Sequence, residues 1–555
     1  MKKRQSEYKP LLFTTTLRNP ERLKDFLTIF SEYDGEILTN EIVGKVAKTL
    51  TQKGLYQPMK VSQNVKDKWE NEIELSEAES ERVLADNPQS HKEAGFDRGW
   101  ASRFDTWFKI AKELGFVWYW QNEKIKFSES GKMLLDKEKP ENELMVFANA
   151  FAKYQRHNPF RRVLNKNVPL ILLIQTIQLL NKDQAFNGTG ISKLEIPLLL
   201  CWKNDDAESL YQEIKKLRKK YGYSPSNETI LELCYGSLNE TKRDDNSILG
   251  DYPDDFIRKM RLTGLISLRG GGRFIDINTK EIATVDYILK NYISYPNFTS
   301  EKRFFEYIGT IDNNLIATLS VYRAPVRITD KELEKWVKHY EWETIKTEML
   351  NLAQKKSSGD DILKVIEQPL RLEFLTSLAI LKKLPNVIVK PNFISDDEGL
   401  PTSFASGGNP DIECLENKDT VLVEVTLLTG TQQHIRESFS VQRHLEEYIK
   451  NGIKSYSVFI SPKVFIDTHR YFKFIKTDGF EVRILDIDKF VYSLEEKNDI
   501  KRSNSMINKI NGHYASVYLN HVRTMRDKDF KEIWKNKNGD LKLLEKKMYK
   551  ILKRI

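Results

Sequence analysis

A chain of 555 residues is longer than a single hydrophobic core usually supports, so we expect three or more domains. Apolar residues make up 40% of it and charged residues 30%, and no apolar run approaches the roughly 18 residues needed to span a bilayer. This composition excludes a helical membrane protein, and the net charge of +9 is compatible with a nucleic-acid partner without requiring one.

The compartment is indicated by the N-terminus and by the cysteines. Residues 1–5 are basic but lack the apolar stretch and the cleavage site of a signal peptide. The three cysteines, Cys201, Cys234 and Cys414, are far apart in the sequence, which argues against a disulfide framework and against a zinc motif. We therefore expect a cytoplasmic protein.

The first recognisable unit lies near residue 110. Residues 102–114 have helical apolar spacing and end at Gly115, a residue typical of helix C-termini. Two short β-prone segments, 116–120 and 124–127, follow with a turn between them, and residues 128–132 then open another helix. Helix, glycine, hairpin and helix is the outline of a winged helix.

The same outline returns further along the chain. A helix over residues 256–263 ends at Gly264, and β-prone segments 265–268 and 273–277 flank a turn of three glycines at 270–272. The sequence therefore predicts two winged-helix-like subdomains within residues 1–295. Such helices commonly enter the DNA major groove while the wing touches the backbone, although helix–hairpin units also serve as interaction modules.

Basic side chains around these two helices are candidate DNA contacts. Each is more often a solvated charge or a phosphate contact than a reader of base edges. The candidates are Arg98, Arg103, Lys109, Arg258, Lys259, Arg261 and Arg273.

The C-terminal half begins with a charged, mostly helical stretch over residues 296–368, which we interpret as a helical linker. Short apolar strands are expected at 456–461 and 480–485 with a helix at 465–476 between them, the pattern of a parallel crossover. We therefore predict a mixed α/β domain over residues 369–555, in which the part after Lys501 is a basic helical tail.

A pair of carboxylates marks this domain. Asn409-Pro410-Asp411 leads into an expected strand at 411–414, and after a turn the return strand at 420–428 carries Glu424. A hairpin would bring both carboxylates to neighbouring strand ends, where hard oxygen ligands can hold a divalent cation. The alternative is an ordinary hairpin in which Asp411 caps a turn and Glu424 faces water.

Two helices offer further acidic groups. Glu373 sits among apolar residues of the helix that precedes the hairpin, so its surroundings are expected to be dry, although glutamate is also common near helix N-termini. After the hairpin, a helix could present Glu437 and His444 from one face towards Asp411 and Glu424. A single glutamate on a helix is more often solvated.

Taken together, these blocks resemble the AlwI-like family of type IIS restriction and nicking endonucleases. Order, spacing and residue type agree best over residues 372–445, and more weakly over the N-terminal half. The similar blocks are 372–376, 386–411, 424–426, 430–433 and 437–444, with weaker ones at 15–21, 115–117 and 128–134.

The resemblance implies a multidomain α+β protein. Its N-terminal region would read a short asymmetric double-stranded DNA site, and a helical linker would join it to a C-terminal α/β domain of the PD-(D/E)XK nuclease fold. That domain would cut a few bases outside the site. A departure is Thr426, which stands where nucleases of this fold usually have a lysine, so the group that activates water is unassigned.

The implied chemistry is Mg²⁺-dependent hydrolysis of a phosphodiester. Asp411, Glu424 and the backbone carbonyl of Val425 would ligate the metal. Glu373 and Glu437 would position water or a second ion, and His444 would orient Glu437 or contact phosphate.

Partners and alternatives follow from a single catalytic site, which cuts one strand. Cutting both strands would need a transient homodimer or a partner nuclease subunit, and a cognate DNA methyltransferase is the expected functional partner. The chain could instead nick one strand, or it could be a DNA-binding regulator with an inactive nuclease-like domain. A repair nuclease that recognises DNA structure is a further alternative.

Overall fold

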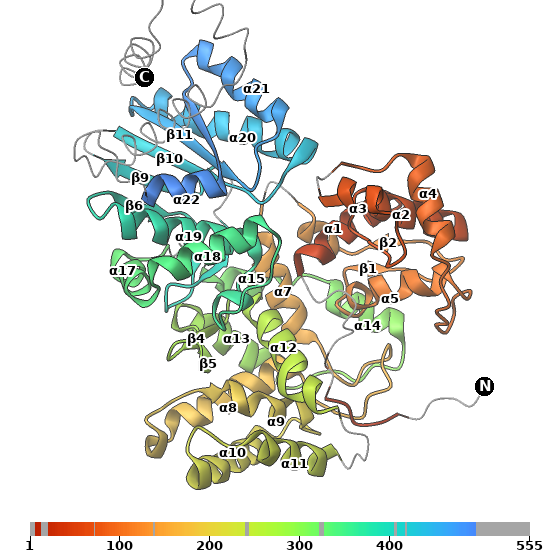
Figure 1. The fold of residues 1–555 in the computed structure, drawn as a ribbon. Coiled ribbons are helices and arrows are strands. Elements are labelled where there is room, and N and C mark those ends of the chain that lie inside the picture. Colours follow the sequence, from red (N-terminus) through yellow and green to blue (C-terminus); the bar gives the residue numbers. More distant parts are fainter. Residues whose placement is uncertain are drawn as a thin grey trace, which may run out of the picture. The chain divides into compact units, whose positions relative to one another are not determined.

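The computed structural model describes residues 6–10, 12, 20–70, 73–136, 139–238, 244–320, 327–404, 408–416 and 419–495 (Figure 1). The predicted basic helical tail after Lys501 lies outside these residues, and so does part of the similar block at 15–21. Within the described residues no helix is long and apolar enough to cross a membrane. The three cysteines are buried and free.

Contacts between residues divide the chain into two compact units. The first unit is Met1–Arg327, Gly359–Leu370 and Phe393–Gly407, and the second is Ile328–Ser358, Arg371–Asn392 and Gly408–Ile555. Residues 328–358 of the expected linker thus group with the second unit, and residues 393–407 of the expected nuclease domain group with the first. The coarse expectation of a multidomain α+β protein is confirmed.

The N-terminal part of the first unit is helical and has an aromatic core. Phe30 packs edge-on against Phe104 and Tyr119, and all three rings are fully buried. Its helices are α1 (Pro20–Ser31), α2 (Asn40–Gln52), α3 (Gln63–Glu70), α4 (Glu77–Asp86) and α5 (Trp100–Glu113), followed by strands β1 (Val117–Trp118) and β2 (Lys126–Phe127).

The predicted helix, glycine and hairpin are confirmed here, with shorter strands than expected. Gly115 follows α5 with φ +76°, the left-handed conformation expected of a helix C-terminus, and β1 pairs antiparallel with β2. The hairpin is short because part of its second segment bonds elsewhere: the N–H of Ile125 donates to the carbonyl of Glu36, and Lys124 bridges to Ile37.

The rest of the first unit is also mainly helical. Helix α12 leads through Gly264 (φ +71°) into the hairpin of β4 and β5, as predicted, and β3 adds a third strand beside β5. The elements are α6 (Glu129–Leu134), α7 (Asn142–Lys153), α8 (Pro169–Lys182), β3 (Ile191–Ser192), α9 (Ile196–Cys201), α10 (Ala207–Tyr221), α11 (Asn227–Leu238), α12 (Tyr252–Arg261), β4 (Ile266–Arg269), β5 (Phe274–Ile277), α13 (Ile282–Tyr292), α14 (Glu301–Gly309) and α15 (Asn313–Thr318), together with β7 (Ile394–Ser395) and β8 (Pro401–Ser403).

The second unit is built on a five-stranded sheet of order β12-β11-β10-β9-β6. Strands β10, β11 and β12 run parallel, whereas β9 is antiparallel to both β10 and β6. Its elements are α17 (Asp330–His339), α18 (Trp342–Ala353), α19 (Gln368–Lys383), β6 (Ile388–Pro391), β9 (Ile412–Glu416), β10 (Asp419–Val425), α20 (Gly430–Lys450), β11 (Ser455–Ser461), α21 (Ile466–Ile475), β12 (Val482–Asp486) and α22 (Ile487–Glu495).

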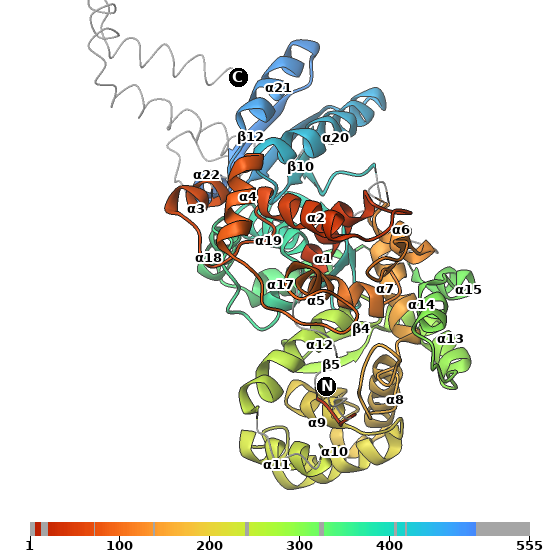
Figure 2. The same cartoon turned by 90° about the vertical axis from the view of Figure 1, so that its right-hand side faces the viewer.

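Both sequence predictions for this sheet are confirmed. β9 and β10 form the predicted hairpin, and β11–α21–β12 is the predicted parallel crossover. Helices α20 and α21 lie side by side in both views, and Val441 of α20 and Phe472 of α21 share a buried cluster with Phe459 of β11 (Figures 1 and 2). This packing fixes α20 against the sheet that carries the hairpin.

Two glycine substitutions should have opposite effects on stability. Gly115→Ala places a methyl group 2.6 Å from the Gly309 nitrogen at a left-handed φ, so we expect it to lower the free energy of unfolding by about 2 kcal/mol or more. Gly44→Ala fills open space on the exposed face of α2 and should raise it by about 0.5–1 kcal/mol. Thermal denaturation of the two variants would check this, and a Gly115→Ala protein as stable as the parent would contradict it.

Candidate active site

The β9–β10 hairpin brings Asp411 beside Glu424. Ile412 pairs with Val423 in the antiparallel ladder, so one further step of the same register sets Asp411 opposite Glu424. Directly opposite residues of an antiparallel pair point to the same face, with Cβ atoms about 5 Å apart. The hairpin register therefore places two carboxylates side by side at one end of the sheet.

Main-chain bonds hold Asp411 on both sides. The N–H of Val425 donates to Asp411 Oδ2 at 2.7 Å. Asn392, next to the end of β6, donates its N–H to the Asp411 carbonyl at 2.9 Å and its side-chain amide to the Pro410 carbonyl at 2.7 Å. Sequence reasoning did not single out Asn392, because a polar residue after a strand is common and its partners become visible only in the pairing of β6 with β9.

Helix α20 adds Glu437 and His444 to this end of the sheet. His444 Nδ1 lies 2.9 Å from Glu424 Oε1, and the Thr426 hydroxyl lies 3.2 Å from Glu437 Oε1, to which it donates. The two helix residues are seven positions apart, which is close to two helical turns, so they share a face. His444 thus hydrogen-bonds Glu424, whereas the sequence suggested that it orients Glu437 or contacts phosphate.

Glu373 completes the group from helix α19. Its side chain is 3% exposed, and Glu373 Oε2 has no hydrogen-bond partner among the described residues. Its neighbours in α19, Leu372 and Phe374, are apolar and fully buried, as the sequence led us to expect. A buried carboxylate oxygen with no partner is costly unless the group is protonated or a cation is bound.

The electrostatics of the group are unusual because negative charge is concentrated without a matching lysine or arginine. Burial raises the pKa of Glu373 well above its usual value, and the charges of Asp411, Glu424 and Glu437 raise it further. None of these four carboxylates forms an ion pair with lysine or arginine within the described part of the chain.

Burial also raises the pKa of the other three acids, and a neighbouring carboxylate adds to this for Asp411 and Glu424. Burial and then Glu424 raise the pKa of Asp411, although the Val425 N–H opposes this, and burial and then Glu437 raise the pKa of Glu424. Burial also raises the pKa of Glu437, against the Thr426 hydroxyl. Burial lowers the pKa of His444, so its imidazole favours the neutral form.

The donor set fits a hard divalent cation in its chemistry. Carboxylate oxygens are the ligands that Mg²⁺ prefers, and a cation would remove the repulsion that raises these pKa values. Among the described residues no three such side chains already stand at metal-ligating spacing. Rotation of side chains would therefore have to accompany cation binding, with the backbone hydrogen bonds of Asp411 kept.

The candidate DNA contacts differ in how exposed their side chains are and in whether they are paired. Arg98 and Arg273 are exposed and Arg258 is half-buried. Arg103 is half-buried beside His91, and Lys109 lies 3.6 Å from Glu93.

Lys259 and Arg261, by contrast, are 4% exposed and form ion pairs with Asp255 and Asp396. These two side chains point into the protein, so we withdraw them as DNA contacts. A helical spacing of basic residues does not distinguish an outward-facing side chain from one that is paired inside.

A scan against protein-family models gives two matches, over residues 112–322 and 312–491, to the AlwI restriction endonuclease family. The chain belongs to that family. It is therefore a restriction enzyme, a nuclease that acts on DNA. The AlwI family match covers both the described hairpin with its carboxylates and most of the first unit.

Other comparisons add less. No curated protein matches the chain. Among solved structures, the chain is similar to the small subunit of the heterodimeric restriction endonuclease R.BspD6I, with 28% identity over 31% of this chain and 88% of that one, and a TM-score of 0.26.

The raised carboxyl pKa values predict how stability depends on pH in the metal-free protein. Glu373 binds its proton more tightly when folded than when unfolded, where its pKa is about 4.3, so its contribution is fully favourable below that pH and is lost as pH rises. We expect Glu373→Gln to raise the melting temperature in chelator, and to raise it more at pH 8 than at pH 5.

Glu348→Gln is the matched control, because Glu348 is a buried glutamate of the second unit that is not among the groups raising the Glu373 pKa. The two variants would be compared by thermal denaturation at both pH values. A Glu373→Gln gain that is equal at both pH values, or equal to that of Glu348→Gln, would contradict the cluster.

Proposed function

We propose that this AlwI-family enzyme is a type IIS restriction endonuclease. The first unit would bind a short asymmetric double-stranded DNA site, and the second would hydrolyse phosphodiester bonds a few bases outside it with Mg²⁺. The observation that carries the proposal is the convergence of Glu373, Asp411, Glu424 and Glu437, buried and without a lysine or arginine partner in the described chain, in a restriction enzyme family member. The hairpin fits a PD-(D/E)XK site, with Pro410-Asp411 directly before β9 and Glu424 on β10.

Asp411, Glu424 and the Val425 carbonyl are the residues that would hold the cation. When bound, Mg²⁺ lowers the pKa of a coordinated water and offsets charge on the phosphodiester. His444 would keep the Glu424 carboxylate oriented through its Nδ1 contact. Glu373 would hold water from the side of α19, where its free oxygen atom lies.

Glu437 would take the role left open by the missing lysine. Burial raises the pKa of its carboxyl, so it accepts a proton from water more readily than an exposed glutamate does. The Thr426 hydroxyl, which stands at the lysine position, donates to Glu437 and would fix its orientation. Thr426 would thus act by orienting Glu437, and would not supply the positive charge that a lysine brings at this position.

The number of strands cut depends on association. A single carboxylate cluster hydrolyses one strand per visit, so a double-strand break needs a second copy or a partner nuclease subunit. A chain acting alone would be a nicking enzyme. A restriction enzyme also needs protection of its own sites in the cell, so we propose a cognate DNA methyltransferase as functional partner.

The experiment that tests this function is digestion of plasmid DNA of known sequence. Cleavage in Mg²⁺ that stops in chelator, followed by run-off sequencing of both strands, should show cuts at a fixed offset from one asymmetric site. Supercoiled plasmid in both conditions would favour a regulator with an inactive nuclease-like domain. Cutting of branched DNA without a fixed sequence would favour a structure-specific nuclease.

Removal of the metal ligands should separate binding from cleavage. We expect Asp411→Ala or Glu424→Ala to slow cleavage more than about a hundredfold, because loss of residues that merely orient metal ligands already costs about 10–100-fold. Binding to the specific site, measured by gel shift, should persist. The control is Asp419→Ala on the same hairpin, whose carboxylate pairs with Lys454 and should be dispensable. Full cleavage by Asp411→Ala would refute the assignment.

A phosphate contact should show itself in the salt dependence of binding. Arg273 is exposed beside β5, so we expect Arg273→Ala to weaken binding about equally for all DNA sequences and to lower the slope of log K against log salt by about 1. Arg470→Ala, an exposed arginine of the second unit, is the control. Titrations at several salt concentrations would measure both slopes, and an unchanged slope for Arg273→Ala would remove it from the interface.

A further inference from the structure

Residues 393–404 belong to the first unit, although the chain on either side of this segment belongs to the second. The chain belongs to the second unit up to Asn392 and again from Gly408, but residues 393–404 with strands β7 and β8 belong to the first. This excursion, which we name the anchor loop, lies directly before Asp411 in the sequence. Its contacts within the first unit are therefore of interest for the active site.

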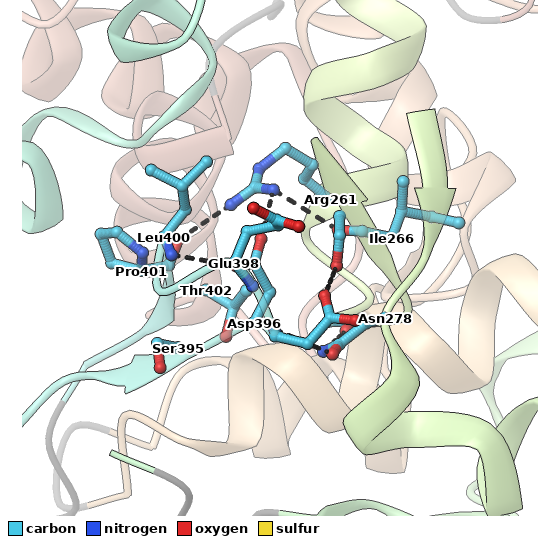
Figure 3. A network of polar contacts seen from close by, with 12 residues as sticks. Arg261, Ile266, Asn278, Ser395, Asp396, Glu398, Leu400, Pro401 and Thr402 are labelled. Atoms are coloured by element: carbon cyan, nitrogen blue, oxygen red, sulfur yellow. Dashed lines mark hydrogen bonds and ion pairs between the residues drawn. The ribbon is translucent and has the colours of Figure 1, made fainter. Parts of the chain in front are cut away.

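A buried ion pair holds the centre of the anchor loop. Arg261 donates to Asp396 at 2.9 Å and to the Pro401 carbonyl at 3.1 Å, and the Asp396 side chain is fully buried (Figure 3). Asp396 also accepts from the N–H of Leu400, which closes the loop on itself. Removing either partner of such a pair leaves a buried charge uncompensated.

A second arginine holds the next two residues. Arg269 of β4 lies 2.6 Å from Asp397 and 2.9 Å from Glu398. Thr279, just after β5, donates both its N–H and its hydroxyl to Asp397 at 2.9 and 2.6 Å. Asp397 and Glu398 are thus held by the β4–β5 hairpin and by Thr279 just after it. This hairpin is the wing of the second winged-helix-like segment.

Hydrogen bonds to the main chain of the anchor loop add to these side-chain contacts. Lys280 donates to the Asp396 carbonyl at 2.7 Å, and the N–H of Asp397 donates to Asn278 Oδ1 at 3.2 Å. Both partners come from the residues that follow β5, the same short stretch as Thr279. The loop is therefore fixed in its backbone as well as in its side chains.

The acidic side chains of the anchor loop do not occupy an exposed DNA-binding surface in place of DNA phosphates. Arg261 is 4% exposed and Asp396 is fully buried, so a phosphate could not replace the carboxylate without unpacking the loop. The geometry is that of a permanent anchor, with charges satisfied inside the protein.

Both ends of the anchor loop connect to Asp411. At its start, Asn392 is bonded to the carbonyls of Pro410 and Asp411. At its end, the chain is back in the second unit at Gly408, three residues before Asp411 in sequence. A displacement of the loop by the β4–β5 hairpin would therefore reach the main chain of Asp411 through Asn392.

We propose that Arg269 and Asp397 are positioning residues, which set the main chain of Asp411 through the anchor loop and so couple the DNA-recognition unit to cleavage. The coupling to cleavage rests on the proposed function, whereas the mechanical link to Asp411 does not. The physical basis is the covalent step from Phe393 to Asn392 and the hydrogen bonds of Asn392 to the carbonyls of Pro410 and Asp411.

Hydrogen exchange of the full-length protein without DNA tests the mechanical link. Asp397→Asn should speed exchange about tenfold at the amides of residues 411–413 and of Val425, whose N–H is bonded to Asp411. Asp183→Asn is the matched control, because Asp183 is a first-unit aspartate of the same 9% side-chain exposure, paired with Lys215. It should leave those amides unchanged. Faster exchange confined to residues 393–404 in Asp397→Asn would overturn the proposal.

Kinetics test the coupling. Asp397→Asn should lower the cleavage rate at saturating DNA about tenfold and leave the affinity for the site unchanged. Tighter DNA binding with undiminished cleavage would instead mean that the loop blocks DNA, and would overturn the proposal. If Asp397→Asn does not fold, Arg269→Lys, which keeps the charge but loses the fork of donors, serves in both assays. If the parent protein cuts no DNA, the proposed function fails and the exchange result still decides the link.

Discussion

Repulsion among Glu373, Asp411, Glu424 and Glu437 is the constraint on which the second unit depends. Each carboxyl is brought out of water, and the charges of its neighbours raise the pKa of Glu373, Asp411 and Glu424 beyond the effect of burial alone. A fold selected for stability alone would avoid such a group, because unpaired buried charge is expensive. Its presence in an AlwI-family restriction enzyme makes sense if the missing positive charge arrives with a cation.

The fold meets this constraint with rigid elements. The hairpin register sets Asp411 opposite Glu424, and α20, the helix that brings His444, packs Val441 into a buried cluster with Phe459 of the sheet. Three of the acids lie on regular elements, Glu424 on β10, Glu373 on α19 and Glu437 on α20, and Asp411 directly precedes β9. Preorganisation of this kind keeps the carboxylates close even though they repel one another.

Much of the second unit could be predicted from sequence because its signals are local. The spacing between Asp411 and Glu424 with a polar turn between them predicts a hairpin, and two apolar runs around a helix predict the parallel crossover. The convergence of Glu437 and His444 on that hairpin needs the packing of α20, which spacing only suggests. The inward direction of Arg261 was not predictable, because its partner Asp396 is more than a hundred residues away in sequence, and the local pair of Lys259 with Asp255 does not by itself show that the side chain is buried.

The excursion of residues 393–407 makes the two units discontinuous in sequence, and this limits how the protein can be divided. A nuclease fragment beginning near residue 369 would carry Asp396 without Arg261, and so would expose or strand a carboxylate that is buried in the whole chain. A chimera that exchanges sequence specificity between relatives would need to transfer the excursion together with the N-terminal half. The chain passes between the two units five times, so no single linker separates them.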